Sequence, residues 1–125
     1  MQSKKEAQKI EKLLKDLCSW PTLTFPTEGG FKDADVPTKH GVYIIYNPKK
    51  LVVHVGQALS GKNGLRQRLS NHLYGQSSFA RQHLKGHGEK LRLGYKFRFI
   101  EISDSRERAL LENLAIGKLC PKHLG

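Results

Sequence analysis

The feature that most constrains the fold is a pair of short apolar runs separated by a turn. Residues 42–46 and 51–55 are rich in valine, isoleucine and other apolar side chains, and residues 47–50 between them read Asn-Pro-Lys-Lys. Valine and isoleucine suit the pleated surface of a strand, whereas asparagine and proline favour a reversal of the chain. The segment therefore predicts a β-hairpin.

The length of the chain limits what can be built around this hairpin. With 125 residues, the chain has room for one domain with a single core. Residues 56–63 match the GxxxxGK pattern of a phosphate-binding loop. However, Asn63 stands where a serine or threonine should bind magnesium, Gly64 weakens the next helical turn, and too little chain remains for several βαβ units. A turn permitted by glycine explains the pattern better, and nucleotide binding stays a minor alternative.

Helical periodicity places the other elements. Residues 4–18 carry apolar side chains at three- and four-residue spacing, opposite lysine and glutamate, which predicts an amphipathic helix. Residues 20–39 contain three prolines and two glycines and predict a connector. Further helices are predicted over residues 65–74, 78–84 and 104–119, and a strand over residues 93–99.

The last predicted helix has a clear start signal, because Asp104 is followed three residues later by Glu107. The order of elements predicts a small α+β domain around a short antiparallel or mixed sheet. Residues 1–40 are expected to form a helix and connector that pack on a domain comprising residues 41–125.

The charge of the chain points to a polyanionic partner. Lysine and arginine number 22 against 11 aspartates and glutamates, which gives a formal net charge of +11. Such a surplus attracts nucleic acid by Coulomb attraction and counterion release. An acidic membrane surface is the lesser alternative, and a merely solvated basic surface is the simplest one. The cations expected to contact a phosphate backbone are Arg66, Arg81, Lys85, Arg92, Lys96 and Arg98.

Cysteine content and hydropathy indicate the compartment. Cys18 and Cys120 are too few and too far apart for a disulfide framework or a CxxC metal clip. The first fifteen residues are charged, and no apolar run is long enough to cross a membrane. We therefore expect a reducing, cytoplasmic location and no membrane partner.

Two triplets in the predicted hairpin carry a family signature. Residues 41–43 read Gly-Val-Tyr, and residues 54–56 read His-Val-Gly. In sequence and spacing they resemble the paired signatures of the GIY-YIG nucleases. The following helix carries Arg68 and, one turn later, His72 on the same face. The family places its catalytic arginine at the position of Arg68, and some of its restriction enzymes have a histidine where His72 stands.

The last helix extends this resemblance. Glu112 precedes Pro121 by nine residues, as the metal-binding glutamate of the family precedes its own proline. Residues 107–121 also resemble the corresponding helix of the incision subunit of excision repair. The resemblance runs from residue 41 to residue 124, and it implies a three-stranded, mostly antiparallel sheet flanked by helices.

Phosphodiester hydrolysis gives these side chains specific tasks. The reaction needs an activated water, neutralisation of phosphoryl charge and help for the leaving oxygen. Glu112 lies in a nearly apolar helix, where a carboxylate facing the interior needs a cation, and the resemblance implies Mg²⁺ (or Mn²⁺). Arg68 offers a planar fork to phosphate oxygens. Tyr43 acts as general base if nearby cations lower its pKa, and His72 orients it or takes its proton.

Three positions depart from the family pattern. His54 replaces the tyrosine of the second triplet, and we expect it to assume that residue's phosphate contact or proton transfer. Leu124 stands where the family often has asparagine, and His123 where it often has tyrosine. Taken singly, each site residue also fits an ordinary surface or core role, so the joint occurrence carries the interpretation.

The sequence thus predicts a metal-dependent endonuclease that hydrolyses DNA phosphodiester bonds. Its site would comprise Tyr43, His54, Arg68, His72 and Glu112, with Glu112 as the metal ligand. The alternative is a catalytically inactive nucleic-acid-binding module of the same fold. A chain of this size leaves no room for a second DNA-binding domain, so specificity would come from residues 1–40, from a homodimer or from a partner protein.

Overall fold

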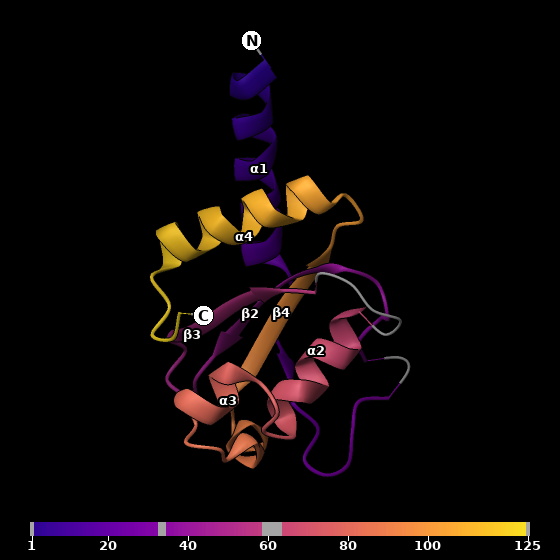
Figure 1. Cartoon of the computed structure of the whole chain (residues 1–125), viewed down its shortest axis with the longest axis vertical. Helices are drawn as coiled ribbons and strands as arrows, with labels where there is room; N and C mark the ends of the chain where they lie inside the picture. The colour runs from indigo at the N-terminus through magenta and orange to yellow at the C-terminus, as the bar shows by residue number, and fades with distance from the viewer. Residues whose placement is uncertain (1, 33–34, 59–63, 125) are drawn as a thin grey trace.

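Figure 1 shows the computed structural model of the chain, which describes residues 2–32, 35–58 and 64–124. In this part of the chain one sheet has its strands in the order β1-β4-β2-β3, and every neighbouring pair is antiparallel. The predicted α+β class is confirmed. The strands are β1 (Leu23–Thr24), β2 (Gly41–Tyr46), β3 (Val52–Gln57) and β4 (Lys96–Glu101).

The sheet has four strands in the described residues, and the prediction of three was wrong. The additional strand, β1, comes from the connector and pairs with β4 over two residues. Pro21 and Pro26 flank it, and they limit its length because proline cannot donate a ladder hydrogen bond. A strand this short shows no alternation of side chains, so the sequence pattern did not reveal it.

Strands β2 and β3 form the predicted hairpin. Asn47 closes the turn, since its Oδ1 accepts hydrogen bonds from the backbone N–H groups of Lys49 (2.9 Å) and Leu51 (3.0 Å). Strand β2 lies between β3 and β4, and its first five residues are buried. The hairpin therefore supplies one of the two inner strands of the sheet in the described residues.

Strand β4 begins three residues later than the prediction. A 3-10 helix, η1 (Gly88–Arg92), runs up to Leu93, whose side chain is 73% exposed. Gly94 then turns the chain with φ of +90°, a conformation that glycine adopts without strain. The alternation holds inside the strand, where Phe97 is buried between exposed Lys96 and half-buried Arg98.

Helices cover both faces of the sheet (Figure 1). On one face, α1 and α4 enclose a core that includes Leu17 and Leu111; on the other, α2 and α3 enclose a core that includes Leu69 and Phe79. None of the helices in the described residues is long and apolar enough to cross a membrane. The helices are α1 (Gln2–Ser19), α2 (Gly64–Leu73), α3 (Ser78–Gln82) and α4 (Ser105–Leu119), each within two residues of its predicted bounds.

Helix α4 begins and ends at signals in the sequence. The Asp104 side chain accepts a hydrogen bond from the backbone N–H of Glu107 (2.9 Å), which confirms the predicted cap. Cys120 ends the helix in the left-handed conformation. The chain then returns to β3, where the backbone N–H of His123 donates to the carbonyl of Val53 (2.9 Å).

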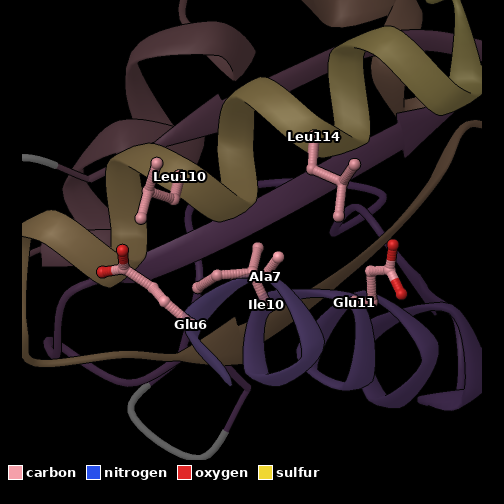
Figure 2. A pocket seen from close by; sticks show the side chains of 6 residues that line it. All are labelled: Glu6, Ala7, Ile10, Glu11, Leu110 and Leu114. Carbon is pink, nitrogen blue, oxygen red and sulfur yellow. The ribbon is translucent and has the colours of Figure 1, made fainter. Parts of the chain in front are cut away.

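The N-terminal helix is held mainly by its apolar stripe. Leu17 is fully buried and Ile10 is 4% exposed. Arg106 of α4 also pairs with Glu6 (2.7 Å), but a surface ion pair adds little stability. Between the two helices lies a groove of about 270 Å³ on the face of the sheet opposite Tyr43 (Figure 2), lined by Glu6, Ala7, Ile10, Glu11, Leu110 and Leu114.

Replacing Leu17 by alanine is expected to lower the free energy of unfolding of the whole domain by about 2–5 kcal/mol, because it removes buried apolar atoms and leaves a cavity. Urea unfolding followed by circular dichroism measures the change. Leu51→Ala is the matched control, since Leu51 is 48% exposed and the change there should stay within about 0.5 kcal/mol. An unchanged midpoint in the Leu17 variant would show that α1 is not part of the cooperative core.

Candidate active site

Tyr43 lies at the centre of the sheet, and a glycine opposite it leaves room for its ring. Tyr43 pairs with Gly56 in the β2–β3 register and is fully buried. A Cβ atom at Gly56 would stand 2.6 Å from Tyr43 Cζ and closer still to the hydroxyl. Gly41 is constrained in the same way by the backbone carbonyl of Ile100 on β4. Close approach therefore requires the glycine of each triplet.

The hydroxyl of Tyr43 meets a histidine that is itself held by a serine. Tyr43 Oη lies 2.6 Å from His72 Nε2, and His72 Nδ1 lies 2.5 Å from Ser77 Oγ. Ser77 also caps α3, since its Oγ accepts a hydrogen bond from the backbone N–H of Ala80 (3.1 Å). The structure thus joins β2, α2 and the start of α3 through one buried chain of polar groups.

Two charged side chains act on this tyrosine. Burial raises the pKa of Tyr43; the guanidinium of Arg68 opposes that rise by its charge and by hydrogen bonding, and the carboxylate of Glu112 adds to it. Burial also holds the pKa of His72 well below its usual value. Tyr43, Arg68, His72 and Glu112 therefore form one electrostatically coupled cluster, although they come from three different elements.

Glu112 is held by a residue that sequence reasoning did not identify. Gln57, the last residue of β3, donates a hydrogen bond from Nε2 to Glu112 Oε1 (2.7 Å). A carboxylate only accepts hydrogen bonds, so the amide must turn its nitrogen toward Glu112. The remaining amide oxygen, Gln57 Oε1, is buried and has no hydrogen-bond partner in the described part of the chain.

Both residues carry oxygen atoms of the kind that a hard divalent cation prefers. Half-buried Glu112 provides one anionic oxygen ligand, and Gln57 Oε1 is an acceptor without a described donor. Magnesium is commonly held by one or two carboxylates, with water and substrate phosphate completing its shell. Among the described residues, no three histidines, cysteines or acids are grouped to hold a metal, so most ligands would come from water and substrate.

Four histidines converge around Phe79, which their spacing in the sequence did not reveal. The ring of His54 stacks on Phe79 with centroids 4.7 Å apart, and His83 stacks at 5.4 Å. His72 and His123 meet the same ring edge-on at 5.4 and 5.5 Å. These residues come from β3, α2, the end of α3 and the C-terminal segment, so only the folded chain brings them together.

His54 is buried within this cluster. Its side chain is 1% exposed, and burial, with the neighbouring His123 and Arg68, lowers its pKa to about 3. His54 Nδ1 lies 3.3 Å from His123 Nδ1, and the other ring nitrogen of His123, Nε2, lies 3.0 Å from Gln82 Oε1. The ring centroids of His54 and Tyr43 are 5.9 Å apart. Thus His54 adjoins the cluster as a neutral, enclosed group.

The cations predicted to contact DNA do not share one face. Arg66 and Arg81 lie on α2 and α3, where each donates to a backbone carbonyl, and Lys85 is exposed just after α3. Lys96 and Arg98 lie on β4 and point toward the face covered by α1. Arg98 donates to the carbonyl of Cys18, and its guanidinium carbon lies over the Tyr46 ring, 5.1 Å from the ring centroid.

The β4 cations line a separate pocket of about 300 Å³ at the end of the sheet where β2 ends. The pocket contains no acidic side chain among its lining residues, which include Tyr46, Lys50, Lys96 and Arg98. Arg92, the remaining predicted cation, donates to two backbone carbonyls of the connector. The basic charge is therefore divided over the molecule.

The structure brings together all five predicted site residues and adds Gln57 and Ser77 to them. A signal for Ser77 was present in the sequence, since serine before a short helix is a common cap. Gln57 gave no signal beyond its place after the second triplet. The nucleotide-binding alternative rested on residues 59–63, which lie outside the described residues, and on Gly56, which lies in β3 beneath Tyr43.

Acid is expected to destabilise the fold through the buried histidines. A histidine whose pKa is lower in the folded than in the unfolded chain binds its proton first in the unfolded chain, so the free energy of unfolding falls as the pH falls. For His54 this window runs from about pH 6.5 down to about pH 3. Its contribution to the slope is at most about 1.4 kcal/mol per pH unit.

Urea unfolding at several pH values measures this slope. His54→Asn should show a shallower decline of stability with acid than the unsubstituted chain. Equal slopes in the two proteins would contradict a neutral, enclosed His54.

This chain is similar to known proteins in its structure. No family model matches the chain, and no curated protein matches it. The magnesium-bound crystal structure of the GIY-YIG N-terminal endonuclease domain of UvrC from Thermotoga maritima is similar, with a TM-score of 0.52 and 26% identity. The match covers 73% of this chain and 89% of that domain.

Point variants of the same domain match equally well. One carries an asparagine-to-alanine substitution and another a tyrosine-to-phenylalanine substitution; both are bound to the catalytic divalent cation of that enzyme, at 26% identity and a TM-score of 0.52. The match covers 73% of this chain and 88% of each variant. The resemblance seen in the two sequence triplets is therefore confirmed for the fold: this chain has the architecture of a GIY-YIG nuclease domain.

Proposed function

We propose that the protein is a divalent-metal-dependent endonuclease that hydrolyses DNA phosphodiester bonds. One observation carries the proposal: the Tyr43 hydroxyl is acted on by both the guanidinium of Arg68 and the carboxylate of Glu112. A proton-transfer group, a phosphate-binding fork and a metal-binding oxygen thus belong to one cluster. Similarity to a magnesium-bound endonuclease domain supports the same chemistry.

Each side chain has a distinct task in this proposal. Arg68 binds two phosphate oxygens through its planar fork and neutralises charge that develops on the phosphoryl group. Glu112, steadied by Gln57, holds the cation. Bound there, Mg²⁺ supplies Lewis-acid chemistry to the phosphate and to the leaving oxygen. Tyr43 exchanges a proton with the substrate side, and His72 and His54 shape its surroundings.

The raised pKa of Tyr43 has a consequence for substrate binding. An isolated buried tyrosine keeps its proton at neutral pH, because burial disfavours the phenolate. Added positive charge at Glu112 would remove the anionic influence that raises the pKa and would favour the phenolate. Metal binding at Glu112 therefore prepares the tyrosine for proton transfer.

DNA would be positioned by backbone contacts from cations near this cluster. Arg66, Arg81 and Lys85 lie on the side of the sheet that carries Tyr43, whereas Lys96 and Arg98 would contact a more distant part of the duplex. Contacts of this kind carry no sequence information. Specificity would come from α1, a second copy of the chain or a partner protein.

The second candidate function is a nucleic-acid-binding module without turnover. The observation that favours it is the enclosed His54, which is 1% exposed and stands where the family has a tyrosine. Such a protein would bind DNA in a salt-dependent way but show no magnesium-dependent cleavage.

Cleavage of supercoiled plasmid with Mg²⁺, with EDTA and with a Glu112→Gln variant tests the proposed activity. We expect EDTA to abolish cleavage and Glu112→Gln to slow it by at least about a hundredfold, since the variant loses the anionic oxygen that holds the cation. Glu89→Gln is the matched control, because Glu89 is 66% exposed and lies outside the cluster. DNA binding without any cleavage by the folded, unsubstituted protein would favour the binding module.

Gln57→Ala is expected to weaken divalent-metal binding by about tenfold, because Glu112 loses the partner that orients it and the site loses an oxygen. Titration with Mn²⁺ followed by electron paramagnetic resonance measures the affinity directly. Gln67→Ala is the matched control, since Gln67 is exposed on α2 and its side chain donates to Asn71, outside the cluster. Unchanged affinity in the Gln57 variant would remove Gln57 from the metal site.

A further inference from the structure

The hydrogen-bonded chain Tyr43–His72–Ser77 contains three polar hydrogens but only two hydrogen bonds. Its two links join Tyr43 Oη to His72 Nε2 (2.6 Å) and His72 Nδ1 to Ser77 Oγ (2.5 Å). The two hydroxyls and the neutral imidazole each carry one hydrogen. One hydroxyl hydrogen must therefore point out of the chain, and the tautomer of His72 decides which one.

The two tautomers lead to opposite arrangements. If His72 carries its hydrogen on Nδ1, it donates to Ser77, accepts from Tyr43, and leaves the serine hydrogen outside the chain. If the hydrogen is on Nε2, His72 donates to Tyr43, accepts from Ser77, and leaves the tyrosine hydrogen outside the chain. In the second arrangement Nε2 is already protonated and cannot take the proton of Tyr43.

The surroundings of Ser77 favour the second arrangement. Ser77 is 3% exposed, and in the described part of the chain its hydroxyl contacts His72 Nδ1 and the backbone N–H of Ala80. The N–H of Ala80 can only donate. A hydrogen on Nδ1 would therefore make Ser77 Oγ accept twice and leave its own hydrogen buried without a described acceptor, which folded proteins avoid.

The surroundings of Tyr43 can receive the remaining hydrogen. The carboxylate of Glu112 and the guanidinium of Arg68 both act on the pKa of the Tyr43 hydroxyl. A carboxylate accepts hydrogen bonds, so the tyrosine end of the chain has an acceptor in its surroundings, whereas Ser77 faces the N–H of Ala80, which can only donate.

We propose that Ser77, the residue that caps α3, is a positioning residue that fixes His72 as the Nε2–H tautomer. His72 then donates to Tyr43, and the hydroxyl hydrogen of Tyr43 points away from His72, toward the side of Glu112. The catalytic meaning of this inference rests on the proposed function: Tyr43, and not His72, exchanges a proton with the substrate side. The tautomer itself exists whether or not the protein cleaves DNA.

The tautomer is measured directly by long-range proton–nitrogen correlation spectra of ¹⁵N-labelled protein near neutral pH, with His72→Asn used to assign the His72 ring. We expect a protonated Nε2 and an unprotonated, accepting Nδ1. A hydrogen on Nδ1 in the unsubstituted protein would overturn the proposal, and this result needs no variant at residue 77.

Two substitutions at residue 77 test the role of the serine. Ser77→Thr keeps a hydroxyl and should leave the spectrum of His72 unchanged. Ser77→Asp can still cap α3, but a carboxylate only accepts, so it should place a hydrogen on Nδ1. If Nδ1 stays unprotonated in the aspartate variant, Ser77 does not control the tautomer and the proposal fails.

Plasmid cleavage by the same variants separates this inference from the proposed function. We expect Ser77→Asp to slow cleavage by at least about tenfold, as a wrong tautomer does in other enzymes, and Ser77→Thr to retain it. The Nε2–H signature without any cleavage by the unsubstituted protein would refute the nuclease and keep the tautomer. Cleavage together with an Nδ1–H signature would do the reverse.

Discussion

The ring of Tyr43 fills the space that Gly56 leaves on the neighbouring strand, and the polar groups of the cluster are arranged around this contact. Because the tyrosine lies in an inner strand, its ring is fixed by the sheet and its hydroxyl is presented to α2. A side chain at Gly56 would displace the hydroxyl from His72. The glycine of this triplet thus has a steric role in the molecule, because one strand must approach the aromatic ring of the next.

Burial gives this cluster its chemical character. Burial disfavours the charged forms of Tyr43, His54 and His72, so the pKa of the tyrosine rises and those of the histidines fall. Neutral imidazoles act as directed donors and acceptors, which suits them to positioning. The charged groups that act on Tyr43 are Arg68 and Glu112, which lie at the edge of the cluster. The site therefore separates a neutral, hydrogen-bonded interior from a charged edge that can meet phosphate and metal.

The same core also connects distant parts of the chain. Phe79 of α3 contacts four histidines, one of which, His123, belongs to the segment after α4. Because that segment pairs with β3 through its backbone, the C-terminal end helps to close the cluster. On the opposite face, α1 and α4 bury a separate apolar core. The sheet is thus supported on one face by aliphatic packing and on the other by packing that includes the polar site.

The sequence by itself determined the hairpin, the bounds of the helices within two residues and the α+β class, since these follow from local periodicity, turn residues and caps. It also indicated Tyr43, Arg68, His72 and Glu112, through two triplets and their spacing to later helices. Tertiary structure alone decided that β1 joins the sheet, that Gln57 holds Glu112, and that His54 is enclosed. These features depend on contacts between residues far apart in the chain, and such contacts leave no periodic pattern in the sequence.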